Sequence, residues 1–161
     1  MSFREKILTW TQLDPWRQAA RQAGRRLVVT NGCFDILHVG HVTYLETARG
    51  YGDLLLVGVN GDRSVRELKG PDRPLNSESD RAAVLAALES VDAVCVFAEK
   101  RAVNFLRQAQ PDIYVKGGDY TLDTLDQNER QAVESAGGRI VILPFVPGKS
   151  TTGLLEKMAA Q

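Results

Sequence analysis

The sequence has few cysteines and histidines, no excess of either charge and no long hydrophobic run. Its two cysteines, Cys33 and Cys95, lack the spacing of a metal site or a disulfide framework, so we expect both to be reduced. Lys and Arg together number 20, as do Asp and Glu, so charge gives no reason to expect a nucleic acid or an anionic membrane as a partner. No apolar run reaches the length of a membrane span, and the start, MSFREKILTW, lacks the apolar core of a signal peptide, which predicts a cytoplasmic protein.

A chain of 161 residues, 43% of them hydrophobic, is long enough for one domain with a buried core. We expect a single domain over 1–161, in which residues 1–26 are a lead-in with a helix from about 14 to 24. Apolar runs then alternate with helical patterns, and the predicted strands are residues 27–30, 53–59, 92–97, 112–116 and 139–143. This alternation predicts an α/β fold: a Rossmann-like, three-layer domain with a five-stranded parallel sheet and helices on both faces.

Residues 27–41, LVVTNGCFDILHVGH, are the most informative stretch. A short buried strand is followed by a glycine-containing turn and by a helical pattern that begins at His41. The only two histidines, His38 and His41, stand at this helix start, where free backbone N–H groups and the helix dipole attract phosphate. Imidazoles there can bind phosphate oxygens and stabilise developing negative charge. The alternatives are a metal site formed by Asp35 and the two histidines, or a purely structural turn.

Further polar residues follow predicted strands or begin predicted helices. They are Arg81, Lys116, Asp119, Ser150, Thr151 and Thr152. Because ligands of parallel α/β sheets bind outside the carboxyl ends of the strands, these residues should line one rim, and their cations and hydroxyls suit a triphosphate. Residues 65–76, with two prolines and a glycine, should form a mobile loop. Its Lys69 either contacts phosphate when the loop closes or remains in solvent.

The stretch GCFDILHVGH resembles the HxGH signature of the nucleotidyltransferase superfamily, which includes cytidylyltransferases and adenylyltransferases. With LKGPDRP, DRAAVLAALESVD, PDIYVKGGDY and GKSTTGLLEKM in the same order, residues 25–158 resemble the adenylyltransferase domain of bifunctional heptose-phosphate kinase/adenylyltransferases. The resemblance implies adenylyl transfer from ATP, with Mg²⁺, to D-glycero-β-D-manno-heptose 1-phosphate. The products would be pyrophosphate and ADP-heptose, a precursor of the lipopolysaccharide core. It also implies a homodimer, and without the sugar-kinase domain we expect the stand-alone form.

The resemblance assigns roles to individual residues. His38, His41 and Lys69 would be catalytic. Asp35 begins the site and is expected to bind the substrate, although magnesium or the backbone of the turn is open as its partner. Lys116 is our candidate, from its chemistry and place, for binding the acceptor phosphate. The nucleotide would be bound by Gly32, Cys33, Phe34, Gly40, Arg81, Gly117, Gly118, Asp119, Ser150, Thr151 and Thr152. The superfamily commonly has ISTT where this chain has Lys149 before Ser150, and this departure blurs the nucleotide preference.

Residue chemistry alone leaves the substrates open. Asp119 or a backbone carbonyl near it can accept a hydrogen bond from an exocyclic amine, which both adenine and cytosine carry. Lys116 can bind the phosphate of a sugar phosphate or simply end its strand in solvent. A cytidylyltransferase acting on glycerol 3-phosphate or a related phosphate is therefore an alternative. A nucleotide-binding or metal-binding module without enzymatic activity is another.

Overall fold

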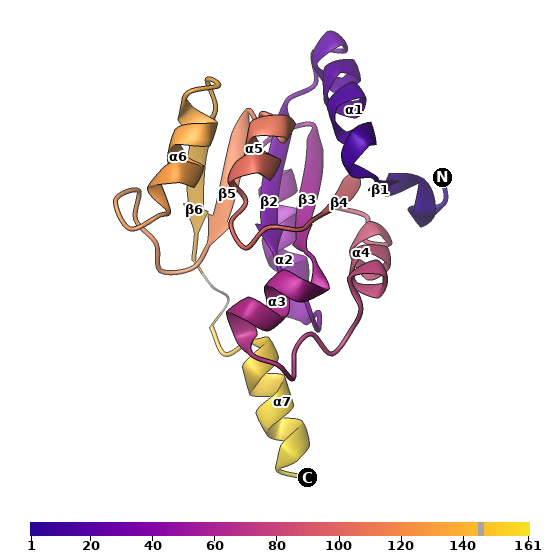
Figure 1. Cartoon of the computed structure of the whole chain (residues 1–161), viewed down its shortest axis with the longest axis vertical. Coiled ribbons are helices and arrows are strands. Elements are labelled where there is room, and N and C mark those ends of the chain that lie inside the picture. The colour runs from indigo at the N-terminus through magenta and orange to yellow at the C-terminus, as the bar shows by residue number, and fades with distance from the viewer. Residues whose placement is uncertain (145–146) are drawn as a thin grey trace.

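The protein is built on a parallel sheet of six strands (Figure 1). The computed structural model describes residues 1–144 and 147–161. The strands lie in the order β1-β4-β3-β2-β5-β6, and every neighbouring pair is parallel. They are β1 (Ile7–Leu8), β2 (Leu27–Gly32), β3 (Leu54–Asn60), β4 (Ala93–Phe97), β5 (Ile113–Gly117) and β6 (Arg139–Leu143).

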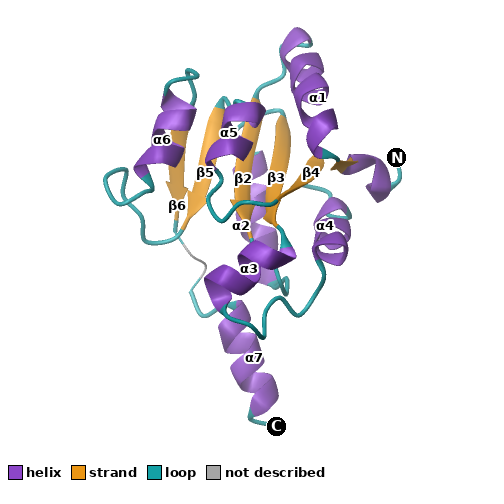
Figure 2. Ribbon diagram, in the orientation of Figure 1, coloured by secondary structure: helices purple, strands orange, loops and turns teal. Residues whose placement is uncertain are grey.

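Helices cover both faces of the sheet (Figure 2), which confirms the predicted α/β architecture. They are the 3₁₀ helix η1 (Phe3–Lys6) and the α-helices α1 (Trp10–Gln22), α2 (Val39–Arg49), α3 (Asp62–Lys69), α4 (Glu78–Ala86), α5 (Val103–Ala109), α6 (Gln127–Glu134) and α7 (Thr151–Ala159). One apolar core joins α1, α5 and α6 to the sheet, and a second joins α2 and α4 to the opposite face. No helix in the described part of the chain is long and apolar enough to cross a membrane.

The prediction of five strands is wrong, because the lead-in contributes β1 at the edge of the sheet. This strand has two residues, too few for any alternation of apolar and polar positions to be visible in the sequence. Thr9 then begins α1 through a reciprocal capping box with Gln12, earlier than the predicted start at Asp14. Pro15 therefore lies inside the helix instead of at its first position.

The prediction that residues 65–76 form one loop is also wrong. Residues as far as Lys69 belong to α3, which begins after Gly61 and places Asp62 in its first turn and Arg66 and Lys69 in its last. This charge order favours a helix through the dipole. The glycine and the two prolines favoured a loop over the whole segment, but the loop begins only at Gly70, after the end of α3.

The order of the strands fixes where a ligand can bind. The chain passes from β2 to β3 and β4 on one side of the sheet and then returns to add β5 on the other side of β2. The carboxyl ends of β2 and β5 therefore form the topological switch point, where open α/β sheets bind ligands. The HxGH turn follows β2 and Gly118-Asp119 follows β5, so the predicted site residues lie at this point.

Three aspartates hold the opposite, amino edge of the sheet in register. Asp53, Asp92 and Asp112 each precede a strand, and each carboxylate accepts a hydrogen bond from a backbone N–H of the neighbouring strand region. The three bonds measure 2.7 Å and come from Arg26, Leu55 and Leu27, respectively. Because a carboxylate pairs a backbone donor that would otherwise lie unbonded at the sheet edge, these bonds help to align the strands.

Candidate active site

His38 and His41 form a reciprocal capping box at the start of α2. His38 is the N-cap residue, and its Nδ1 accepts a hydrogen bond of 3.0 Å from the N–H of Gly40. The backbone N–H of His38 in turn donates to Nδ1 of His41 over 3.3 Å. The two ring centroids lie 4.0 Å apart. Two imidazoles therefore do here what Ser and Glu do in most capping boxes.

This geometry fixes the proton on each ring. An Nδ1 atom that accepts a backbone hydrogen bond carries no proton, so the neutral ring of either histidine carries its hydrogen on Nε2. Burial and the neighbouring His38 lower the pKa of His41 to about 4. Burial and the charge of Lys149 lower the pKa of His38. At neutral pH the pair thus consists of two neutral N–H donors.

Gly40 lets the helix start close to its neighbours. A Cβ at this position would lie 2.7 Å from Cε1 of His38 and 3.1 Å from Cβ of Lys149, which precedes α7. Any side chain here would displace the His38 ring, because real Cβ atoms do not approach within 3.0 Å. The glycine therefore lets the residue before α7 lie next to the start of α2.

The turn before α2 has an unusual backbone. Phe34 has a positive φ of 49°, a left-handed conformation that is uncommon for a residue with a side chain. Its ring packs edge-on against His41 at a centroid distance of 5.6 Å and also lies against Gly32. The backbone carbonyl of Cys33 accepts a hydrogen bond from the guanidinium of Arg81. Burial raises the pKa of the Cys33 thiol. Gly32, Cys33 and Phe34 thus shape the turn, and nucleotide contact by them remains a prediction.

Asp35 holds this turn to the segment after α3. Its carboxylate accepts hydrogen bonds from the backbone N–H groups of Leu75 and Asn76 and from Nε of Arg73, the last at 2.7 Å. The amide of Asn76 also donates to the Asp35 carbonyl oxygen. Burial acts to raise the pKa of Asp35, but these hydrogen bonds and the Arg73 charge hold it below its usual value.

In the structure Asp35 is bonded to the protein, and the substrate contact expected of it stays a prediction. A buried carboxylate that already accepts these hydrogen bonds has its lone pairs occupied by the protein. Within residues 1–144 and 147–161, no three His, Cys, Asp or Glu side chains converge as a metal-binding group. The metal site of Asp35, His38 and His41 that the sequence left open is therefore not formed.

Arg81 is buried and bonded to the chain, so the expected approach to nucleotide phosphates is not what the structure presents. Its side chain is 2% exposed, and its guanidinium donates to the carbonyl oxygens of Asn76, Cys33 and Asn60. It also pairs with the carboxylate of Asp62 at 2.9 Å. Arg81 lies on the buried side of α4 together with Ala82 and Leu85, so the helix directs it inward. Sequence could not show that backbone carbonyls, and not a ligand, satisfy it.

The end of β5 lies beside α2 and α6. A Cβ on Gly117 would lie 3.0 Å from the ring of Tyr44 in α2, whose hydroxyl donates to the Val115 carbonyl. Gly118 has a φ of 122°, which favours glycine, and Asp119 is exposed at the rim. Nζ of Lys116 lies 4.0 Å from Oε2 of the buried Glu129 carboxylate, at the outer limit of an ion pair. Its predicted role with an acceptor phosphate stays a prediction.

The start of α7 supplies hydroxyl groups to the same region. Ser150 caps the helix by accepting a hydrogen bond of 2.9 Å from Gly153, and the Thr151 hydroxyl donates to the carbonyl oxygen of Ile36 over 3.0 Å. Thr152 is exposed. The Thr151 bond ties the start of α7 to the HxGH turn, so two helix N-termini with their unpaired N–H groups lie near one another. Backbone N–H groups at helix starts are a common means of binding phosphate, so this arrangement is the candidate phosphate site.

Sequence reasoning missed the residues that support this site. Arg73, Asn76 and Tyr44 were not singled out, although they hold the turn or the end of β5. One signal was available: a carboxylate at a phosphate site, such as Asp35, requires a cationic or N–H partner, and Arg73 stands in the only arginine–proline pair of the chain. Lys69, at the end of α3, is exposed as expected.

Comparisons with known proteins agree with this geometry. The cytidylyltransferase-like family matches residues 29–152, which include β2, the histidine pair and the start of α7. The chain belongs to this family. The predicted resemblance to nucleotidyltransferases is confirmed, and the family is one of enzymes.

Individual proteins within this likeness are bifunctional HldE proteins and one solved structure. The chain is 53% identical over 141 residues to the bifunctional protein HldE of Geotalea uraniireducens, a match that covers 88% of this chain and 28% of the relative. It is 51% identical over 156 residues to HldE of Methylobacillus flagellatus, with 97% and 32% covered. The chain thus spans about a third or less of these relatives. A crystal structure of a lipopolysaccharide core biosynthesis protein from Thermoplasma volcanium matches with a TM-score of 0.62 and 30% identity, over 76% of this chain and 98% of that one.

The lowered pKa of His41 predicts that the fold loses stability in mild acid. The unfolded chain binds a proton at His41 near pH 6.5, whereas the folded protein does so only near pH 4. The unfolding free energy should therefore fall as the pH drops from about 6.5 to 4, by at most about 1.4 kcal/mol per pH unit. Urea denaturation at several pH values measures this, with His41→Asn as the control that removes the titrating ring. Parallel stability curves for the two proteins would contradict the neutral, buried state of His41.

Proposed function

We propose that the chain transfers an adenylyl group from ATP to D-glycero-β-D-manno-heptose 1-phosphate, releasing pyrophosphate and ADP-heptose for the lipopolysaccharide core, and that it does so in the cytoplasm. The observation that carries the proposal is the neutral histidine pair at the start of α2, next to the capped start of α7. Identity of 53% to an HldE protein over 88% of the chain selects the substrates. The lipopolysaccharide core biosynthesis protein that matches the fold points the same way.

The histidine pair suits the leaving group. In an in-line displacement, negative charge builds on the bridging and terminal oxygens of the departing pyrophosphate. The Nε2–H groups of His38 and His41 would donate hydrogen bonds to these oxygens, and the N–H groups at the start of α7 would add to them. Because the rings are neutral at working pH, their contribution is hydrogen bonding that strengthens in the transition state, and no proton transfer is required.

The acceptor needs no activation by a protein base. A sugar phosphate is already anionic near neutral pH, so its oxygen can attack the α-phosphorus directly. A phosphorus–oxygen bond to the acceptor forms while the bond between the α-phosphorus and the bridging oxygen breaks, and pyrophosphate leaves with that oxygen. Catalysis then consists of positioning and electrostatic stabilisation, which is typical of phosphoryl transfer.

Magnesium would enter as part of the substrate, Mg·ATP. Mg²⁺ at such sites is usually held by phosphate oxygens and water with one or two carboxylates. Asp119, an exposed carboxylate at the rim, is the residue that could hold such an ion. Bound to the phosphates, the ion offsets charge on the leaving pyrophosphate. Lys69, exposed at the end of α3, is the protein cation that we assign to the triphosphate when the following loop closes.

A cytidylyltransferase is the second candidate, since the matching family bears that description. The segment after β5 offers the backbone of Gly117 and Gly118 and the carboxylate of Asp119, which would suit the amine of either base.

Pyrophosphate release from paired substrates separates the candidates. We expect ATP with the β-anomer of the heptose 1-phosphate to give the largest kcat/KM among ATP, CTP, GTP and UTP, each paired with a panel of sugar phosphates and glycerol 3-phosphate. The product should have the mass of ADP-heptose. A larger kcat/KM for CTP with glycerol 3-phosphate would overturn the substrate assignment and leave the chemistry in place.

Substitutions at His38 can separate the capping role of its ring from its chemical role. His38→Asn keeps a cap that accepts from Gly40 but removes the Nε2–H donor, whereas His38→Ala removes both. Both variants should lower kcat by about 10²-fold or more, the effect of losing one transition-state donor. Only His38→Ala should also lower the unfolding free energy, by about 1 kcal/mol. Near-normal kcat in His38→Asn would show that the ring is only a cap.

A homodimer is part of the same proposal and rests on the family resemblance. Sedimentation at micromolar concentration should therefore show a species of twice the chain mass of 17.7 kDa. A single species of 17.7 kDa would refute the dimer without bearing on the chemistry.

A further inference from the structure

A buried polar chain runs from α6 to the carboxyl end of β2. Tyr114 in β5 is 1% exposed, and its hydroxyl donates a short hydrogen bond to Oδ1 of Asn31, near the end of β2. Glu129 in α6 is 4% exposed; its Oε1 accepts a bond of 2.9 Å from the Ala102 N–H, and its Oε2 lies 3.5 Å from the Tyr114 hydroxyl. Lys116 approaches the same Oε2 at 4.0 Å. None of these groups has a place in the leaving-group chemistry described above.

The chain determines how the Asn31 amide points. Burial, and after it the charge of Glu129, raises the pKa of Tyr114 well above its ordinary value, so the hydroxyl keeps its proton. That proton is donated to Oδ1, which turns the Nδ2 group of Asn31 away from Tyr114. In the part of the chain that the structure describes, Asn31 is partly exposed and its Nδ2 donates to no protein acceptor. A buried hydroxyl and carboxylate therefore hold an unused donor at the rim.

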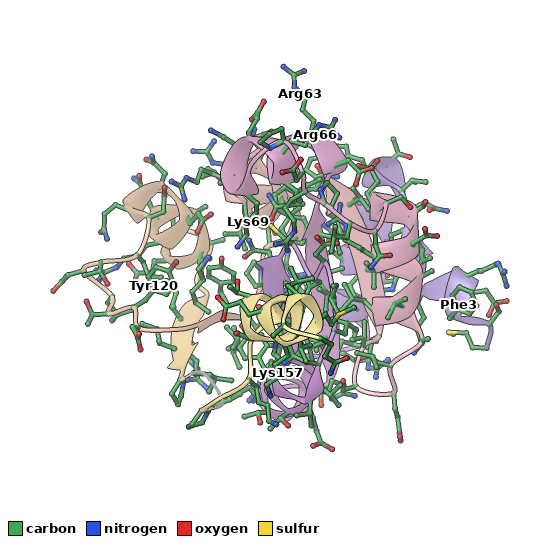
Figure 3. The ribbon with its side chains drawn as sticks, turned by 90° about the horizontal axis from the view of Figure 1, so that it is seen from below. Phe3, Arg63, Arg66, Lys69, Tyr120 and Lys157 are labelled. Carbon is green, nitrogen blue, oxygen red and sulfur yellow. The ribbon has the colours of Figure 1, made fainter. Side chains whose placement is uncertain are left out.

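The face of the sheet on which Asn31 lies indicates which of the two substrates its Nδ2 group can reach. Side chains alternate along a strand, and Thr30 faces α2 through its bond to Tyr44, so Asn31 faces the side of α5 and α6. Lys116 shares this side, since it approaches Glu129 of α6. The histidine pair lies on the other side, with α2. Figure 3 views this edge and shows α3, which carries Lys69, and α2 on opposite sides of α7.

In-line transfer then separates the two substrates across the sheet edge. The attacking and leaving oxygens lie on opposite sides of the α-phosphorus. With the pyrophosphate on the side of α2 and α7, the attacking oxygen and the acceptor that carries it lie on the side of α5 and α6, where Asn31 and Lys116 are found.

We propose that Asn31 binds the sugar phosphate acceptor, donating from Nδ2 to one of its oxygens, and that Tyr114 and Glu129 are positioning residues that orient this amide. Lys116 lies beside the same subsite and supplies positive charge for the acceptor phosphate. Glu129 holds the Lys116 side chain in this position. The inference rests on the proposed function, because it takes the acceptor to be a phosphorylated sugar. A purely structural network would make the same bonds but would leave the affinity for the acceptor unchanged.

Steady-state kinetics with each substrate varied separately test the assignment. Asn31→Leu keeps roughly the shape and removes the donor without adding a charge, and it should raise KM for the sugar phosphate at least about tenfold with KM for ATP changed less than about twofold. Tyr114→Phe should shift the same KM in the same direction by a smaller factor, because the amide stays in place but is free to rotate. The matched control is Asn128→Ala, an exposed asparagine next to Glu129 in α6, which should change neither KM.

The outcomes separate the subsite from the function. Equal shifts of both KM values, or a loss of stability in urea with both KM values unchanged, would overturn the role of Asn31 and leave the enzyme assignment intact. If another acceptor in the panel proves to be the substrate, the same variants measured with that acceptor decide the role of Asn31. A wild-type protein that releases pyrophosphate with no pair of substrates would overturn both the proposed function and the subsite.

Discussion

The conformation of the HxGH turn depends on two buried charged side chains, Asp35 and Arg81, whose hydrogen-bonding groups are paired with other parts of the chain. Asp35 lies within the turn and receives N–H groups from the segment after α3 together with the guanidinium of Arg73. Arg81 enters from α4 and donates to the carbonyl oxygens of Cys33 and Asn60. A buried ion is tolerated only when its hydrogen-bonding capacity is filled, so neither group can shift without leaving a costly unpaired charge. This pairing holds the left-handed Phe34 and the histidine pair in one geometry.

The alternation of side chains along β2 and β5 separates the chemistry of the site into two halves. Positions that face α2 connect to Tyr44 and to the helix start that carries the histidines. Positions that face α5 and α6 carry Asn31, Tyr114 and Lys116. In the proposed reaction, the sheet at its switch point would present two distinct surfaces, one for each side of the reacting phosphorus. No hinge or second domain is needed to separate them.

Much of the fold and the place of the site could be predicted from the sequence, because both follow from local patterns. Residues 139–143 were predicted as a strand with the observed bounds, and the other long strands were found to within two residues at each end. The two-residue β1 escaped because its pairing partner, β4, is distant in the sequence. The roles of Asp35 and Arg81 escaped for a related reason. A charged residue beside a phosphate motif looks like a ligand contact, and only tertiary structure shows whether the chain itself has already satisfied it.

The departure at Lys149 has a chemical consequence that the motif alone does not reveal. The superfamily commonly has an apolar isoleucine at this position, whereas here Cβ of Lys149 lies close to Gly40. Burial is the main cause that lowers the pKa of His38, and the charge of Lys149 adds to it. A lowered pKa favours the neutral ring, and only the neutral ring can accept the N–H of Gly40 at Nδ1 while it donates from Nε2. With two neutral imidazoles, net positive charge toward a triphosphate has to come from other groups. Lys149 is therefore suited both to keep His38 in the state that caps α2 and to supply charge that the histidines themselves do not carry.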